Sequence, residues 1–398
     1  MNPIKNPFSP GAGAPPPELV GRENILQQAT VLIGRIKERR PEKSLMLTGL
    51  RGVGKTVLLN RIERQAREEG YKTVYLEARE DRTLGQVLAP ELKRVLFELD
   101  AKAKAKEKVR RAMLALKNFV GNFSVNFGGL SIELEPFHGL ADSGDIESDL
   151  TMLLLAVAEA AEGQEEAIAL FVDEIQYFSE EEFSALIMAM HRIQQKALPM
   201  FLVGAGLPIL PALAGNSKSY AERLFAFPRI DALNKEEARH ALLSPLDKNN
   251  VGITPDAFEQ IFNYTRGYPY FLQEWGYQIW NQTEEPPISF SVVEKASETV
   301  IKRLDENFFR VRFDRLTGNE KKFLGAMAMA AMSSPSRRVR ISDIAVNMGQ
   351  KKSTLAPVRA SLIKKGMIYS PAYGEMDFTV PLFADFMIRM IPPLQKDN

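Results

Sequence analysis

The sequence predicts an α/β domain built on a parallel sheet, followed by two smaller and mainly helical domains. Three observations predict this organisation. Short apolar runs alternate with amphipathic helical patterns up to about residue 233, as in successive βαβ units. Helical patterns predominate after that point, and the chain then shows three helices and a short hairpin. A chain of 398 residues is also too long for one ordinary domain.

Composition excludes several classes of protein. Lys plus Arg number 51 and Asp plus Glu 50, so the chain is not a polyelectrolyte that coats nucleic acid. It has no cysteine, which excludes disulfides, thiolate metal sites and Cys nucleophiles. Its three histidines, His138, His191 and His240, are not at ligand spacing. No apolar run reaches about 18 residues and no signal peptide is present, so we expect a cytoplasmic protein without a membrane partner.

The N-terminal part of the chain contains the first βαβ unit. Residues 1–20, rich in Pro and Gly, are expected to form an extended leader. A helix is predicted over 21–40 and a buried strand over 43–50. A second helix over 56–70 then leads to a strand over 71–79.

An insertion is predicted over residues 84–135. Its first part, 84–121, is a long helical region whose charged middle favours a solvated surface, although its positive excess could also meet phosphate. The segment 123–134 alternates apolar residues around Gly128 and Gly129, which predicts a β-hairpin. This hairpin is a candidate for either a nucleic-acid contact or a protein-docking element.

The α/β pattern resumes after the insertion and completes a domain over 21–233. It consists of a helix from 145 to about 162, a strand over 167–174, a helix over 180–197 and a strand over 198–206.

Two further domains are predicted from the change in pattern. Residues 234–316 read as a helical domain, which we call the lid. Residues 317–398 have the outline of a winged helix. Its expected elements are helices at 319–331, 342–348 and 356–365, with Pro357 in the first turn of the third helix, and a hairpin over 366–380.

A phosphate-binding loop is the clearest motif. Between the first strand and the second helix, the chain matches G-x-x-x-x-G-K-[ST] at every fixed position, through Gly49, Gly52, Gly54, Lys55 and Thr56. The glycines allow successive N–H groups to surround a phosphate at a helix N-terminus. Val53 and Val57 complete the predicted binding segment. Lys55 is expected to neutralise the β- and γ-phosphates, and the Thr56 hydroxyl to bind Mg²⁺.

An acidic pair ends the third predicted strand. Asp173 is expected to hold Mg²⁺ indirectly, through the groups that bind the ion, and Glu174 to polarise a water molecule for attack on the γ-phosphate. Consecutive Asp and Glu at this position favour an ATPase. The dipeptide Asn234-Lys235 begins like a guanine-reading motif, but Glu237 does not fit it, so ATP is favoured over GTP.

The chain resembles the AAA+ ATPases, in particular the origin-recognition and initiator-like branch with its archaeal and bacterial ATP-binding relatives. The resemblance rests on ELVGRE, GLRGVGKT, LFVDE, SYAERLF, GYP and the C-terminal winged helix. It implies that Val20, Gly21 and Arg22 line the adenine site, and that Gly267 and Pro269 in the lid close over the nucleotide. It also implies that Arg223 is an arginine finger acting on a neighbouring subunit, which would make the protein a homo-oligomer. A surface ion pair is the alternative role for Arg223.

Two departures from this family pattern predict slow hydrolysis. The strand ends in Gly204, Ala205 and Gly206, where many relatives have a polar sensor. Tyr270 follows GYP, where initiator-type members often carry an arginine. The loss of one preorganised donor can cost about 10²- to 10³-fold in rate. Slow hydrolysis suits a switch better than a motor.

The C-terminal domain carries the positive charge of the molecule. Residues 317–398 contain 12 Lys plus Arg and 6 Asp plus Glu. Those around the predicted recognition helix are candidates for duplex DNA contacts: Arg337, Arg338, Arg340, Lys351, Lys352, Arg359, Lys364 and Lys365.

Two functional hypotheses follow from this pattern. In the first, the nucleotide state controls the grip of the winged helix on duplex DNA. In the second, which resembles signal-transduction ATPases, the winged helix restrains the core and the output is a protein interaction.

Overall fold

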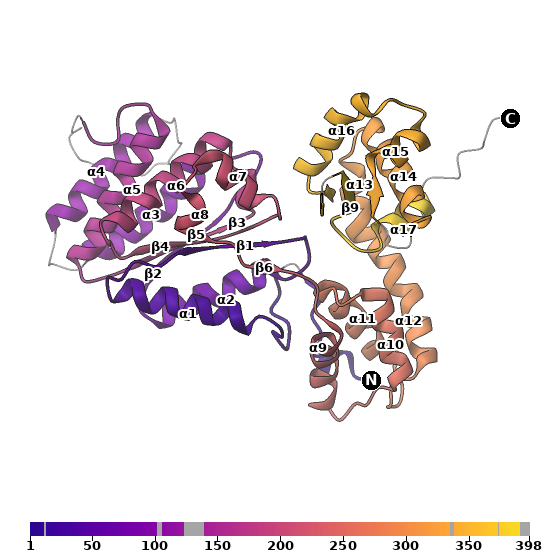
Figure 1. Ribbon diagram of the computed structural model, residues 1–398. Coiled ribbons are helices and arrows are strands. Elements are labelled where there is room, and N and C mark those ends of the chain that lie inside the picture. Colours follow the sequence, from indigo (N-terminus) through magenta and orange to yellow (C-terminus); the bar gives the residue numbers. More distant parts are fainter. Residues whose placement is uncertain (12, 102–105, 123–138, 335–337, 373, 391–398) are drawn as a thin grey trace. The chain divides into compact units, whose positions relative to one another are not determined.

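The computed structural model describes residues 1–11, 13–101, 106–122, 139–334, 338–372 and 374–390. The chain forms two compact units (Figure 1). The α/β unit comprises Arg22–Gly49 and Lys55–Ile230. The helical unit comprises Met1–Gly21, Leu50–Gly54 and Asp231–Asn398. No helix in the described part of the chain is long and apolar enough to cross a membrane.

A parallel sheet forms the centre of the α/β unit, as predicted. Its strands lie in the order β2-β3-β4-β1-β5, and β6 also pairs with β1. Their bounds are β1 Ser44–Gly49, β2 Lys72–Glu77, β3 Ile168–Asp173, β4 Met200–Gly206, β5 Phe225–Ala226 and β6 Arg229–Ile230. Every residue of β1, β3 and β4 is buried, which explains why these strands read as continuous apolar runs. The two-residue strands β5 and β6 are too short to leave a periodic pattern and were not predicted.

Helices cover both faces of this sheet. Figure 1 shows α1 and α2 on one face, and the helices from α3 to α8 on the other. Their bounds are α1 Glu23–Lys37, α2 Lys55–Glu68, α3 Leu84–Asp100, α4 Lys106–Asn122, α5 Ile146–Gly163, α6 Glu180–Gln195, α7 Leu210–Ser217 and α8 Ala221–Leu224. A 3-10 turn, η3 (Ile175–Tyr177), links β3 to α6. The region 84–121, predicted to be one long helical region, contains the two helices α3 and α4. The hairpin predicted over 123–134 lies outside the described residues.

Helices make up the first part of the helical unit after Asp231. They are α9 Lys235–Asp247, α10 Pro255–Thr265, α11 Pro269–Gln282 and α12 Phe290–Arg303, continued by the π-helical turn η4 Leu304–Phe309 and by α13 Arg310–Asp314. Asn234 and Glu237 form a capping box at the start of α9, so Asn234-Lys235 is a helix start here. Arg266, in the left-handed conformation, ends α10.

The C-terminal part has the elements of a winged helix. They are α14 Gly318–Met332, β7 Val339–Arg340, α15 Ile341–Met348, α16 Lys352–Lys364, β8 Ile368–Tyr369, β9 Glu375–Phe378 and α17 Phe383–Met390. The strands form an antiparallel sheet in the order β7-β9-β8. Helix α16 begins at Lys352, so Pro357 lies inside the helix and its expected place in the first turn is wrong. Lys351, which has an extended backbone, directly precedes this earlier start and makes no side-chain capping bond.

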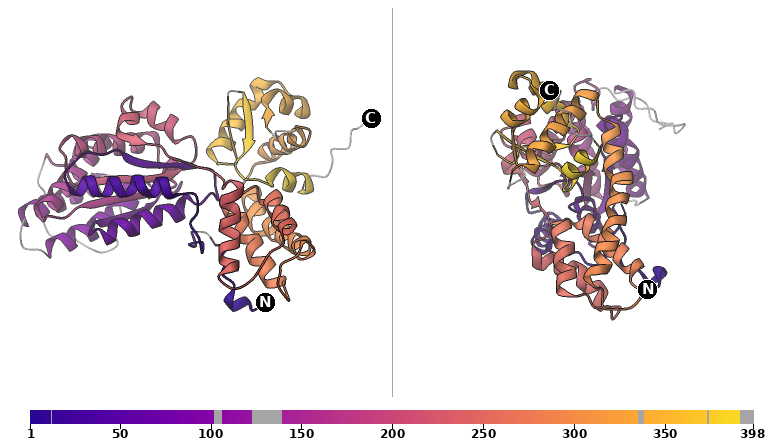
Figure 2. Two further views of the ribbon diagram at one scale, coloured as in Figure 1. Left: turned by 60° about the horizontal axis from the view of Figure 1, so that its bottom comes forward. Right: turned by 90° about the vertical axis from the view of Figure 1, so that its right-hand side faces the viewer.

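The leader packs onto the lid helix α11. Figure 2 shows the N-terminal end of the chain beside the helices of the lid in both views. After the short turn η1 (Pro3–Lys5), the Phe8 side chain is 2 % exposed and lies against Gly276 of α11. The Asn6 amide donates to the Tyr277 carbonyl at 3.0 Å, and the Trp280 indole donates to the Asn2 carbonyl at 2.9 Å. Glycine at 276 leaves space that the Phe8 ring fills.

Candidate functional site

The predicted phosphate-binding motif lies between the first strand and the helix that follows it, and its lysine begins this helix. Strand β1 ends at Gly49 and α2 begins at Lys55. Lys55 is 5 % exposed, and its amine donates to the Gly49 carbonyl at 3.0 Å. The N-terminus of a 14-residue helix follows the loop directly. The arrangement brings a buried cation together with the positive end of a helix, which is what a phosphate requires.

The acidic end of β3 lies beside the same helix. Thr56 on α2 donates its hydroxyl to Asp173 Oδ2 at 2.6 Å. Asp173 is 5 % exposed, and burial raises the pKa of its carboxyl even though the Thr56 bond and nearby Lys55 act in the opposite direction. Thr56 and Asp173 therefore present a hydroxyl and a carboxylate oxygen at one point. Oxygen ligands of this kind suit Mg²⁺, which usually takes its remaining ligands from phosphate and water.

Glu174 has an unusual backbone conformation. Its φ is +51°, in the left-handed region, and its N–H donates to Asp173 Oδ1 at 2.9 Å. A non-glycine residue in this region is strained and often functional. Its carboxylate Oε2 accepts a hydrogen bond from the Gln176 amide. Glu174 is partly exposed, so a water molecule can reach it.

The loop between β1 and α2 contacts the lid within the helical unit. Gly52 and Gly54 have φ values of +83° and +95°, which only glycine adopts readily. A Cβ on Gly54 would meet no atom within 4 Å, so its surroundings are open. The Gly52 carbonyl accepts from the Tyr270 N–H at 3.3 Å, and a Cβ on Gly52 would lie 3.2 Å from the Tyr268 ring. The open, glycine-lined loop fits a phosphate group.

Tyr268 connects this loop with the winged helix. Its side chain is buried, and its hydroxyl donates to the Thr379 carbonyl at 2.8 Å. Burial raises the pKa of this hydroxyl, so it keeps its proton as a donor. Thr379 in turn donates its own hydroxyl to the Gly366 carbonyl at 2.7 Å, at the start of the wing. One tyrosine thus contacts both the phosphate-binding loop and the winged helix.

The residues that the family resemblance assigns to the adenine site, the lid and the arginine finger lie in three different parts of the chain. Gly21 has a φ of +72°, and a Cβ there would press on the Glu237 carboxylate. Arg22 is buried at the start of α1. Gly267 has a φ of +71° and accepts from the Leu233 N–H at 2.9 Å, and Pro269 begins α11. Within the described residues, Arg223 on α8 is exposed and forms no ion pair.

The structure divides the candidate DNA-binding cations into two groups. Lys365 pairs with Glu320 at 2.8 Å, Arg359 donates to the Ser370 hydroxyl at 2.7 Å, and Arg338 pairs with Glu375 at 3.4 Å. The other described candidates are exposed: Arg340, Lys351, Lys352 and Lys364. Arg337 lies outside the described residues.

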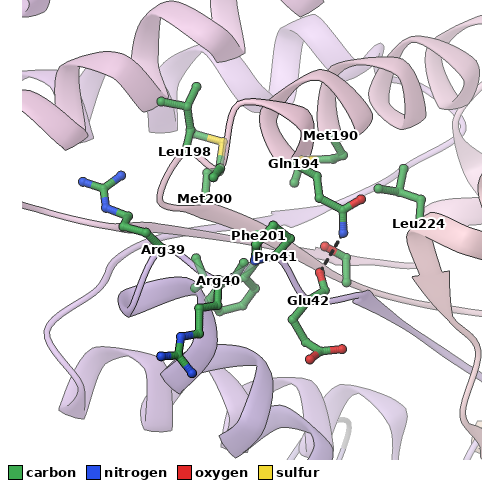
Figure 3. Close-up of a pocket in the computed structure, with 13 residues that line it drawn as sticks. Arg39, Arg40, Pro41, Glu42, Met190, Gln194, Leu198, Met200, Phe201 and Leu224 are labelled. Carbon is green, nitrogen blue, oxygen red and sulfur yellow. Dashed lines mark hydrogen bonds between the residues drawn. The ribbon is translucent and has the colours of Figure 1, made fainter.

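A small cavity lies where strands β1 and β4 begin, at the other end of these strands from the phosphate-binding loop (Figure 3). Its volume is about 10 Å³, close to the smallest space that holds one water molecule. It is lined by Ser44 and Met200, which begin β1 and β4, whereas the phosphate-binding loop follows the end of β1. The Gln194 amide donates to the Glu42 carbonyl at 3.1 Å beside it. This cavity is too small and too distant along the strands to hold a nucleotide.

A glycine-rich loop after the first strand of a parallel sheet, with an acidic pair at the end of another strand, defines a P-loop NTPase. Comparison with known families then places the chain more closely. Residues 18–203 match the AAA ATPase domain family. Residues 306–387 match a Domain of unknown function (DUF8462). No match was found among curated proteins.

Several solved structures match this chain at low sequence identity. The Walker-type ATPase PABY2304 of Pyrococcus abyssi is 16 % identical, with 94 % of this chain and 98 % of that chain covered and a TM-score of 0.57. Cdc6p from Pyrobaculum aerophilum is 16 % identical over 98 % and 99 % of the two chains, with a TM-score of 0.48. The RuvB Holliday junction branch migration motor of Thermotoga maritima is 16 % identical over 90 % and 92 %, with a TM-score of 0.44.

Two residues of the site were missed by sequence reasoning. Tyr268 lies inside the GYP motif, but nothing local indicates that its hydroxyl reaches Thr379, 111 residues later. Gln176 follows the acidic pair by two residues, and its amide accepts from the Leu207 N–H at 3.2 Å. The sequence signal for Gln176 was Gly206, because the absence of a side chain at this position leaves space for the Gln176 amide beside the end of β4.

Proposed function

We propose that the protein is an ATP-controlled switch that transmits the state of its phosphate-binding loop to its winged helix. ATP is held by the loop and Lys55, and Mg²⁺ by Thr56 and Asp173. Glu174 accepts a proton from the attacking water. The observation that carries the proposal is the position of Tyr268, whose ring lies beside Gly52 and whose hydroxyl donates to the Thr379 carbonyl. A phosphate that shifts the loop therefore acts on a side chain that also holds the wing.

Hydrolysis in this proposal is slow, which suits the role of a switch. The end of β4 offers the nucleotide no side chain from Gly204, Ala205 or Gly206 beyond one methyl group. Tyr270 has an uncharged phenol at neutral pH, and burial raises its pKa further, to about 12. A second copy can supply Arg223, which is exposed, to the γ-phosphate. Fewer preorganised charges mean a higher barrier, and the bound state then persists long enough to act as a signal.

Duplex DNA is the output that we propose first. Lys351 and Lys352 lie at the start of α16 and Lys364 at its end, and all three are exposed. A helix with cations at its ends can lie in the major groove while those cations neutralise phosphates.

The test is fluorescence anisotropy of labelled duplex DNA with ATP-Mg²⁺, ADP-Mg²⁺ or no nucleotide, at two salt concentrations. We expect binding that weakens with salt, changes with nucleotide and is lost in K351A/K352A/K364A. The control K37A/K43A/K196A removes the same charge from the α/β unit. Equal loss in both triple variants, or no binding in any nucleotide state, would contradict a DNA output.

A second output, a protein interaction, is favoured by a different observation. Lys365, Arg359 and Arg338 are already engaged by neighbours in the winged helix, which leaves fewer cations for phosphates. The pair between Lys365 and Glu320 is nearly buried on the Glu320 side. If the DNA test fails while nucleotide still changes the exposure of the wing, a protein partner becomes the preferred output.

A further inference from the structure

Gln176 bridges two strands at the edge of the sheet that carries the acidic pair. It lies in η3, directly after β3. Its amide nitrogen donates to Glu174 Oε2, and its amide oxygen accepts from the Leu207 N–H at 3.2 Å. Leu207 follows the last residue of β4. Both polar atoms of one side chain are therefore used, one on the carboxylate and one on the neighbouring strand.

Glycine at position 206 makes this bridge fit. A Cβ on Gly206 would overlap the Gln176 amide oxygen, and its next neighbours would be atoms of Leu210. Strand β4 pairs with β3 on one side and β1 on the other, and Gly206 is in register with Thr48 of β1. The end of β4 thus lies between the strand that leads into the phosphate-binding loop and the strand that carries the acidic pair. The amide occupies the place where a side chain from β4 would otherwise lie.

We propose that Gln176 is a positioning residue for ATP hydrolysis, which orients the Glu174 carboxylate from an anchor on β4. The proposal rests on the ATPase activity described above. In that reaction the water oxygen bonds to the γ-phosphorus, the bond from phosphorus to the bridging oxygen breaks, and Glu174 accepts the proton of the water. Gln176 touches neither the water nor the phosphate. It holds Oε2, which leaves Oε1 as the atom that accepts the proton.

This role follows from the backbone of Glu174. Its φ of +51° turns its side chain away from the direction that an extended strand would give it. A glutamate has three rotatable side-chain bonds, so without a fixed donor its carboxylate would sample many positions. The amide is itself held by the Leu207 N–H, directly after the last residue of β4. An orienting group that is anchored in this way preorganises the base before ATP binds.

The test measures kcat, KM and the equilibrium affinity for ATP in Gln176→Leu and Gly206→Ala. Leucine keeps the approximate volume of glutamine without its amide, and the alanine methyl group displaces the amide from β4. We expect each variant to lower kcat by about tenfold to a hundredfold, the cost of a misplaced catalytic group, with ATP affinity changed less than about twofold. The double variant should be no slower than the slower single variant, because both changes break one bridge.

Three controls separate this role from a structural one. Gln194→Leu removes a side-chain amide that donates to the Glu42 carbonyl near the start of the strands, and it should leave kcat unchanged. Gln176→Asn keeps an amide and should recover part of the rate. Glu174→Gln gives the rate without the base and should bind ATP normally.

The outcomes decide between the proposals. A wild-type chain with no more hydrolysis than Glu174→Gln would contradict the ATPase, and the positioning role with it. Normal wild-type hydrolysis with an unchanged kcat in Gln176→Leu, or with additive losses in the double variant, would overturn the role of Gln176 alone. A fall in ATP affinity equal to the fall in kcat would also overturn it, since that is the signature of a damaged fold.

Discussion

Removal of the Tyr268 hydroxyl is the smallest change that breaks the connection between the phosphate-binding loop and the winged helix. In Tyr268→Phe the ring that lies against Gly52 remains, and only the bond to the Thr379 carbonyl, 2.8 Å long, is removed. Tyr268 is 3 % exposed, so water cannot readily replace the lost donor. A buried carbonyl that loses its donor costs about 1–3 kcal/mol. A free-energy difference of about 1.4 kcal/mol changes an equilibrium constant tenfold. If ATP acts on the winged helix through this bond, the effect of ATP on the equilibrium of the winged helix should therefore fall by about 5- to 150-fold.

Amide hydrogen exchange of the segment around Thr379 measures this effect without a partner. We expect ATP to change the protection of this segment in the wild-type chain and to change it much less in Tyr268→Phe, with ATP affinity the same in both. Tyr270→Phe is the matched control, because the Tyr270 hydroxyl makes only a long bond of 3.4 Å to Glu274. If Tyr268→Phe behaves as the wild type in both exchange and unfolding free energy, the connection through Tyr268 is refuted.

Three further predictions concern nucleotide binding, pH and the lid. Lys55→Ala should lose ATP binding by about 10²-fold or more, because the buried amine is the cation at the loop, and isothermal titration measures this loss. Hydrogen bonds outweigh burial and hold the pKa of Glu320 at about 2, below its ordinary 4.5, so Glu320 stabilises the fold above pH 4.5 and loses this effect as pH falls towards 2. Denaturant unfolding should therefore show wild type and Glu320→Gln converging by about 2 kcal/mol between pH 6 and pH 3, and a constant difference would contradict this assignment. Gly267→Ala should lower the melting temperature far more than Gly70→Ala, since both glycines have positive φ but only a Cβ at 267 would overlap the Leu233 carbonyl.

The chemistry of the loop could be predicted because it is written in consecutive residues. A glycine-rich turn between a buried strand and a helix leaves few alternatives for Lys55 and Thr56, and parallel strand order brings Asp173 to the same edge. The roles of these residues stay predictions, whereas the parallel sheet and the AAA ATPase domain are confirmed.

The contacts that connect the loop to the rest of the chain could not be predicted. Tyr268 reaches Thr379 and Gln176 reaches Leu207 through tertiary packing, which leaves no periodic signal. The basic residues of α16 show the same limit, because a count of charges does not reveal that Lys365 is held by Glu320. The start of α16 at Lys352, before the expected boundary, reflects the weakness of helix-end signals.

The packing of the leader on α11 has a consequence for the order of synthesis. Asn6 donates to the carbonyl of Tyr277, 271 residues later in the chain, and the neighbouring Phe8 fills the space above Gly276. During synthesis Phe8 therefore leaves the ribosome long before the helix α11, on which it packs, has been made. At about 5–20 residues per second this interval is at least ten seconds, during which an apolar aromatic side chain stays in contact with water or with a chaperone. The packing of the lid is complete only when the N-terminal segment, which is synthesised first, binds to α11.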